Sequence, residues 1–77
     1  MKIFGYPRDD EDKIHDLLEI TLVADPSRLR SLAKFIEKRA EEMEDDIDGW
    51  EHCHYSDEDV SLPQNGADVI VFNPRKL

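Results

Sequence analysis

The segment that decides the fold is ADPSRLRSLAKFIEKRAEEMEDDIDG, residues 24–49. Asp25 can accept hydrogen bonds from the free amides of a first helical turn, and Pro26 has no amide that would need a partner. Apolar residues then recur at intervals of three and four, the spacing of one helix face. They are Leu29, Leu32, Ala33, Ile36, Ala40, Met43 and Ile47. The pattern predicts a helix from Pro26 to about Asp46 that packs this stripe on the core, with Gly49 as its stop signal.

Four short strands are expected around the helix. Residues 2–6 form the first and residues 17–24 the second, in which the side chains alternate between two faces. Residues 50–55 and 68–73 form the third and fourth, separated by a polar loop whose Asn65-Gly66 pair favours a turn. The expected fold is α+β, a single domain over residues 1–77 with the order β-β-α-β-β. One long helix packs on a four-stranded, mainly antiparallel sheet.

A single helix covers only one face of such a sheet, yet both faces carry apolar residues. One interpretation is that Trp50, Tyr55 and the loop cover the second face within the monomer, and the other is that a second copy or a partner covers it. A chain of this size buries only about 60 to 65% of its unfolded surface. Self-association would add to this small core, so we expect a homodimer.

Composition excludes several classes of function. The net charge is −9, from 19 acidic and 10 basic side chains, so phosphate backbones and anionic lipid surfaces are repelled and basic partners are favoured. No apolar run approaches the roughly 20 residues that cross a bilayer. The first residues lack the features of a signal peptide, and the single cysteine, Cys53, has no partner for an internal disulfide. We therefore expect a cytoplasmic protein that binds neither nucleic acid nor membrane.

The candidates for chemistry cluster in the third expected strand. Alternation places His52 and His54 on one face with Trp50, and Cys53 on the other. Two imidazoles can share a metal, but zinc sites need three or four protein ligands, and neither His15 nor the acidic residues 57–59 lie at a recognised metal spacing. Cys53 has no base on its own face and is expected to be a small buried residue. The sequence predicts no enzyme, cofactor or metal site, and a small metal-binding protein that uses His52 and His54 remains the alternative.

The charges of the helix run against its dipole, which favours acids at the start and bases at the end. The bases come first, at Arg28, Arg30, Lys34, Lys38 and Arg39. The acids follow, at Glu41, Glu42, Glu44, Asp45 and Asp46. Local rules broken without local gain indicate a functional surface, while a solvated face screened by salt is an equal alternative. Phe35 lies off the apolar stripe, so we expect it to be covered by a chain terminus or available to a partner.

Three stretches resemble a known family. They are residues 3–7, residues 19–26 with Leu29, Ala33 and Phe35, and the pair of residues 49–54 and 68–74. Together they are similar to the thirty-second numbered family of bacterial immunity proteins, predicted to neutralise polymorphic toxins. The resemblance covers most of the chain except the acidic run after Arg8 and residues 56–67. It implies a small bacterial α+β protein that binds and inhibits a toxin, with no catalytic role. Trp50, Glu51, His52 and His54 match an aromatic-Glu-His-x-His stretch in which most members have phenylalanine in place of Trp50.

The leading hypothesis is a non-enzymatic module that binds a protein partner, such as a basic toxin domain, through an acidic surface. Complementary charge speeds such an encounter. The predicted partner-binding residues are Glu37, Glu41, Asp45, Asp48, Trp50, Glu51, His52 and His54. Besides the metal-binding alternative, a dimeric adaptor domain without a toxin partner stays open.

Overall fold

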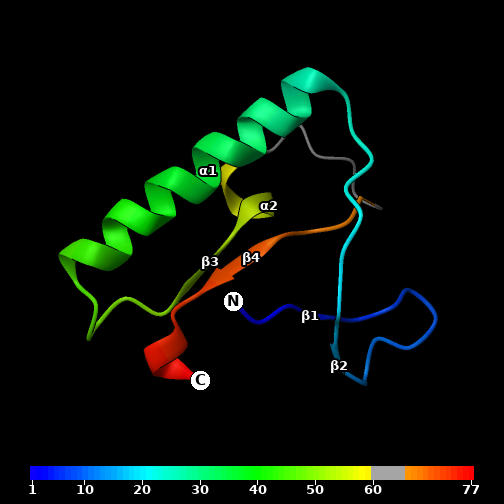
Figure 1. The fold of residues 1–77 in the computed structure, drawn as a ribbon, viewed down its shortest axis with the longest axis horizontal. Coiled ribbons are helices and arrows are strands. Elements are labelled where there is room, and N and C mark those ends of the chain that lie inside the picture. Colours follow the sequence, from blue (N-terminus) through cyan, green and yellow to red (C-terminus); the bar gives the residue numbers. More distant parts are fainter. Residues whose placement is uncertain (60–65) are drawn as a thin grey trace.

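The computed structural model describes residues 1–59 and 66–77. Its elements are β1 (Phe4–Gly5), β2 (His15–Asp16), α1 (Pro26–Asp45), β3 (His52–His54), α2 (Tyr55–Glu58), β4 (Ile70–Phe72) and the 3₁₀ helix η1 (Pro74–Lys76). The long helix α1 lies along one side of the β3–β4 pair, and β1 and β2 lie at the far end of the molecule (Figure 1). The α+β class is confirmed, with the short helix α2 as an addition.

The start of α1 is confirmed. The Asp25 carboxylate accepts hydrogen bonds from the backbone N–H of Arg28 and from Ser27 Oγ, both at 2.9 Å, and Pro26 occupies the first turn. The bond from Arg28, followed by that from Ser27, holds the pKa of Asp25 below its ordinary value. The helix ends at Asp45, one residue before the expected end, and its last turn contains no basic residue.

Gly49 acts differently from the expected stop signal, because it lies in the turn beyond the helix. Its N–H donates to Asp46 Oδ1 at 3.1 Å, and a Cβ at this position would lie 2.5 Å from the other carboxylate oxygen. A larger residue at this position would require the exposed Asp46 carboxylate to move aside, and the φ of Gly49 is not positive, so the backbone here does not require glycine.

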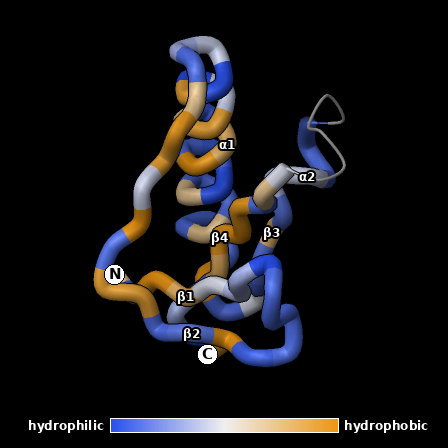
Figure 2. Tube along the Cα trace, turned by 90° about the vertical axis from the view of Figure 1, so that its right-hand side faces the viewer, coloured by the Kyte–Doolittle hydropathy of each residue, from blue (hydrophilic) through white to orange (hydrophobic). Residues whose placement is uncertain are grey.

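The predicted four-stranded sheet is wrong. In the described residues the strands form two separate antiparallel pairs, β1 with β2 and β3 with β4. Residues 17–24 contain no strand, and at the start of this run the Leu17 N–H donates to Ile3 O at 2.7 Å. Its alternating side chains therefore do not belong to a sheet face, and Leu18 and Val23 are 99% and 93% exposed. Figure 2 shows this largely hydrophobic run between β2 and α1.

The core forms where α1 meets α2 and the β3–β4 pair. Leu32, Phe35 and Tyr55 are buried, and Cys53, Val69 and Val71 pack against them. The rings of Phe35 and Tyr55 lie 5.1 Å apart between centroids, so Tyr55 covers Phe35, and neither a terminus nor a partner is required.

The predicted stripe of α1 is only partly correct. Leu32 is buried, but Leu29 and Ile36 are 40% and 46% exposed, and Ala33 and Ala40 are also exposed. The buried side of the helix instead includes Phe35 and Arg39. Phe35 packs on the ring of Tyr55, and Arg39 pairs with carboxylates of α1 and α2.

The outer face of the β3–β4 pair stays open among the described residues. Ile70 and Phe72 are 50% and 39% exposed on it. Trp50 does not cover this face, since its indole N–H donates to Glu42 of α1, and Tyr55 is in the core on the helix side. Residues 60–65, which include Asn65 of the expected turn, lie outside the described part of the chain.

Asn73 ties the end of the chain to the turn after α1. Its side chain is fully buried, and its amide nitrogen donates to the carbonyls of Ile47 and Trp50, each at 2.7 Å. Its amide oxygen accepts the N–H of Arg75 at 3.0 Å and so caps η1. One side chain thus fixes the relative positions of the end of α1, the approach to β3 and the C-terminal turn.

Candidate functional site

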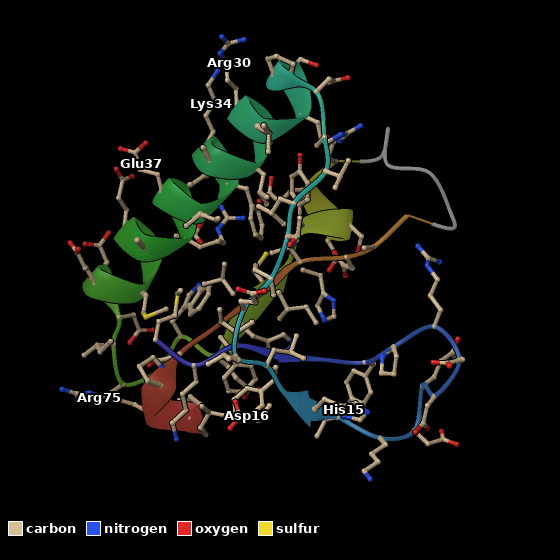
Figure 3. The ribbon with its side chains drawn as sticks, turned by 45° about the vertical axis from the view of Figure 1, so that its right-hand side comes forward. His15, Asp16, Arg30, Lys34, Glu37 and Arg75 are labelled. Atoms are coloured by element: carbon tan, nitrogen blue, oxygen red, sulfur yellow. The ribbon has the colours of Figure 1, made fainter. Side chains whose placement is uncertain are left out.

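The predicted acidic residues of α1 lie on one exposed flank. Glu37, Glu41 and Asp45 follow one another at intervals of four, and within residues 1–59 and 66–77 no side-chain hydrogen bond or ion pair engages them. Figure 3 shows Glu37, with Arg30 and Lys34, pointing away from the body of the molecule. These carboxylates are held on a rigid helix and remain available to a cationic partner.

Asp48 differs from the three helical carboxylates. It lies 2.7 Å from the guanidinium of Arg75, and both side chains are largely exposed. Its charge is therefore balanced in part by a residue near the end of the chain, which sequence spacing could not reveal.

The predicted histidine pair shares one face of β3, as alternation indicates. The two rings lie 5.4 Å apart, and His52 stacks on Phe72 of β4 at 5.5 Å with an interplanar angle of 13°. Glu51 lies 3.1 Å from Nδ1 of His52, while Cys53 turns to the core. Trp50 does not share this face, contrary to the prediction, because β3 begins only at His52 and the alternation does not extend to residue 50.

The predicted residues therefore form two surfaces. The acidic flank belongs to the outer side of α1, whereas His52 and His54 lie on the side of the β3–β4 pair opposite the core. Successive side chains of a strand point to opposite faces. Because Cys53 points to the core, its neighbours His52 and His54 point to the outer face of the β3–β4 pair, away from α1 and its acidic flank.

His54 belongs to a cluster that sequence reasoning missed. Its Nδ1 lies 2.9 Å from Asp68, which also accepts the N–H and hydroxyl of Ser56, each at 2.9 Å. Burial opposes ionisation of Asp68, but the bonds from His54, Ser56 and the N–H of Val69 outweigh it and lower its pKa. Asp68 thereby links β3, the start of α2 and the approach to β4, through contacts over 12 to 14 residues that no local pattern signals.

A metal centre at His52 and His54 is the alternative that the sequence leaves open. Among the described residues no group of three or more His, Cys, Asp or Glu side chains is placed to hold a metal ion. Both histidines of the predicted pair instead have Nδ1 beside a carboxylate.

Arg39 is the second feature that the sequence did not reveal. It is 1% exposed, lies with its guanidinium carbon 5.1 Å from the Phe35 ring centroid, and donates to Glu58, to Glu42 at 3.0 Å and to Cys53 Sγ at 3.5 Å. Burial disfavours its cation, yet the bonds to Glu58 and Cys53 and the charge of Glu42 raise its pKa. The hydrogen bond from Arg39 in turn lowers the pKa of Glu58. The spacing of Leu32, Phe35 and Arg39 could have revealed this inner face.

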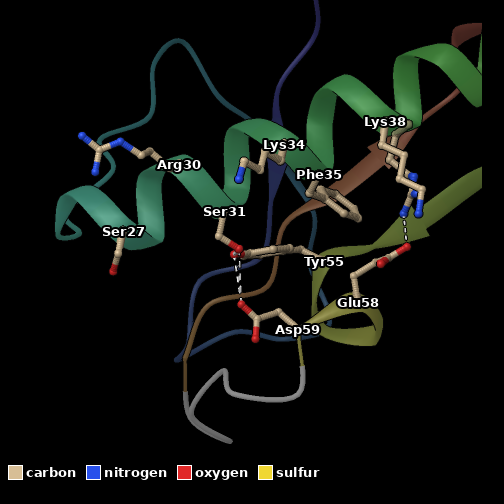
Figure 4. A pocket seen from close by; sticks show the side chains of 10 residues that line it. Ser27, Arg30, Ser31, Lys34, Phe35, Lys38, Tyr55, Glu58 and Asp59 are labelled. Carbon is tan, nitrogen blue, oxygen red and sulfur yellow. Dashed lines mark hydrogen bonds and ion pairs between the residues drawn. The ribbon is translucent and has the colours of Figure 1, made fainter.

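A groove of about 520 Å³ opens between α1 and α2 (Figure 4). Phe35 and Tyr55 are part of its lining. The Tyr55 hydroxyl oxygen lies 2.6 Å from Ser31 Oγ and 3.3 Å from the Asp59 carboxylate, so its one proton can be donated to either. Arg28 lies 2.6 Å from Asp59 and closes this network. Arg30, Lys34 and Lys38 line the helix side, and no ion pair engages these three in the part of the chain that the structure describes.

One of three comparisons with known proteins identifies a family. No helix of the described residues is long and apolar enough to cross a membrane. Neither a curated protein nor a solved structure matches the chain significantly. A family model described as Immunity protein 32 matches residues 19–74, which include α1, β3 and β4 and exceed half of the 77 residues. The chain therefore belongs to the Immunity protein 32 family.

Proposed function

We propose that this protein binds a cognate bacterial toxin and blocks it by occupation, without catalysis of its own. The observation that carries the proposal is the family match over residues 19–74. The toxin is expected to be encoded beside the protein and to meet it in the same cell.

The acidic flank of α1 is the surface that we assign to the toxin. Glu41 and Asp45 are exposed, and no described side chain neutralises them. A toxin domain with a basic binding surface, such as a nuclease, would be attracted over a long distance by these charges and by the net charge of −9. Because the helix backbone is already ordered, little conformational entropy is lost on binding. Glu37 and Asp48 extend the surface at its two ends.

We assign a second contact region to Glu51, His52 and His54. Stacked rings on an open sheet face provide contact area at low entropic cost, and aromatic groups are enriched at interfaces. Trp50 contributes indirectly, since it binds Glu42 and is half-buried. This region supports binding, while the acidic flank sets the rate of encounter.

The test is protection of growing cells. The toxin domain encoded beside this protein is expressed from an inducible promoter together with wild type, with Glu41→Lys/Asp45→Lys, or with the matched control Asp9→Lys/Glu11→Lys. Each double variant reverses two charges and takes the net charge from −9 to −5, but only the first alters α1. Wild type and control should protect, and the α1 variant should not.

Binding measurements with the purified proteins show whether lost protection is due to lost charge attraction at α1. Association of wild type with an inactivated toxin domain should slow steeply with salt, because exposed charges are screened beyond about 10 Å at 0.1 M ionic strength. Loss of that dependence in the α1 variant alone would identify the flank. Equal protection by both variants would exclude it and move attention to His52 and His54, and failure of wild type to protect would overturn the proposed function.

A further inference from the structure

The outer face of α1 carries an apolar stripe that the fold does not use. Leu29 and Ile36 are 40% and 46% exposed, and Ala33 and Ala40 between and after them are exposed as well. Spacings of four, three and four residues place these side chains in one row. The stripe therefore meets solvent, beside the inner face of Leu32, Phe35 and Arg39.

Charged residues follow this stripe in a polarised order. Each stripe position is followed directly by a charge, and Met43 continues the series. The order from the start of the helix is Arg30, Lys34, Glu37, Glu41 and Glu44, two cations and then three carboxylates. No ion pair engages any of the five in residues 1–59 and 66–77. Arg30 and Glu44 are separated by about 21 Å along the helix and cannot neutralise each other within one chain.

We propose that a second copy of this chain docks on the stripe with its α1 antiparallel to the first. A two-fold axis near Glu37 then places Arg30 opposite Glu44 of the second copy and Lys34 opposite its Glu41, and symmetry repeats both pairs. In a parallel arrangement the two rows of charges would lie on opposite sides of the helix pair and could not meet. The cations at the start of α1 and the carboxylates toward its end oppose the helix dipole. In an antiparallel pair, however, the cations of each helix lie beside the carboxylates of the other.

The geometry of the stripe suits helix pairing. Ala33 and Ala40 are small, so they allow α1 and its copy to approach at the 8–10 Å typical of packed helices. Glu37 weakens the pairing, because at the two-fold axis its negative charge lies opposite that of Glu37 in the second copy. One pair of helices of 20 residues buries a small area, which places this dimer among weak, exchanging interfaces. Glu41 also belongs to the proposed toxin surface, so the toxin and the second copy would compete for it. Self-association is measured on the purified chain alone, so its outcome does not depend on the proposed function.

Charge exchange tests the pairing. The full chain is examined by analytical ultracentrifugation at low salt from micromolar to millimolar concentration. Arg30→Glu and Glu44→Lys should each weaken the dimer about tenfold, because each replaces two attractive pairs by two repulsive ones. An equimolar mixture of the two variants should regain the affinity of wild type, since the mixed dimer has opposite charges at both pairs. Glu37→Gln should tighten the dimer.

The controls are Arg8→Glu and Glu11→Lys, which make the same charge changes at exposed positions outside α1, and circular dichroism of every variant. Wild type that stays monomeric throughout, variants that dimerise like wild type, or a mixture that fails to recover would each overturn the proposal. If the mixture dimerises while each variant alone does not, the charge pairs must form between two chains. The same result shows that both variants are folded.

Discussion

Replacement of Arg39 is the most direct test of how the core is built. Arg39→Ala removes two buried methylene groups, worth about 0.8 kcal/mol each, and a cation–π contact with Phe35 worth about 1 kcal/mol. The ion pairs add little, because the Glu42 and Glu58 side chains are each 42% exposed and water can solvate them after the change. The expected loss is about 3 kcal/mol, out of the roughly 4 to 12 kcal/mol that a chain of this size provides.

The measurement is urea denaturation, followed by circular dichroism for α1 and by the fluorescence of Trp50. At a slope of about 1 kcal/mol per M, the midpoint should fall by about 3 M. Arg39→Met keeps the apolar stem and should cost only about 1 kcal/mol. Lys34→Ala, which removes an exposed cation from the same helix, should cost under about 0.5 kcal/mol. Equal losses for the Met and Ala variants would show that charge, rather than the buried stem, dominates, and a loss below 1 kcal/mol for Arg39→Ala would contradict the burial of this side chain.

Three further predictions concern the cap, acid and metals. Asp25→Ala should lower the urea midpoint, and Asp25→Asn, which keeps an acceptor for the first turn, should lower it less. Asp25, Glu58 and Asp68 have folded pKa values below their ordinary 3.8, 4.5 and 3.8, so they stabilise the fold above those values. That stability is lost as pH falls through the folded values, so the unfolding free energy should drop from about pH 4.5 downward, and less steeply in Asp68→Asn. The protein should purify without stoichiometric zinc and should not unfold with a chelator, whereas one metal per chain that disappears in His52→Ala/His54→Ala would favour the metal-binding alternative.

Local chemistry explains what the sequence could predict. The start of α1 follows from Asp25 and Pro26 because a cap involves only neighbouring residues. The run at residues 17–24 was misassigned because alternation describes a half-buried strand only where an edge is available to pair with it. Phe35 was placed outside because the most apolar stripe was assumed to be the inner one, and the ring of Tyr55, 20 residues later, decides otherwise.

The candidate site shows the same division. Exposure of Glu37, Glu41 and Asp45 follows from helical spacing, and the structure agrees. The contacts of Asp48 with Arg75 and of His54 with Asp68 join residues far apart in the chain, so composition and spacing could not predict them.

The buried amide of Asn73 bears on the chemical lifetime of the protein. Hydrolysis of this amide to a carboxylate would replace a donor with a negative oxygen facing the carbonyls of Ile47 and Trp50, which now receive its two hydrogen bonds. Asparagine usually loses its amide when the next backbone nitrogen attacks it, and that nitrogen must first give up a proton. The next residue is Pro74, whose nitrogen has no proton to give. Pro74 therefore blocks the usual route by which the Asn73 side chain would lose its amide.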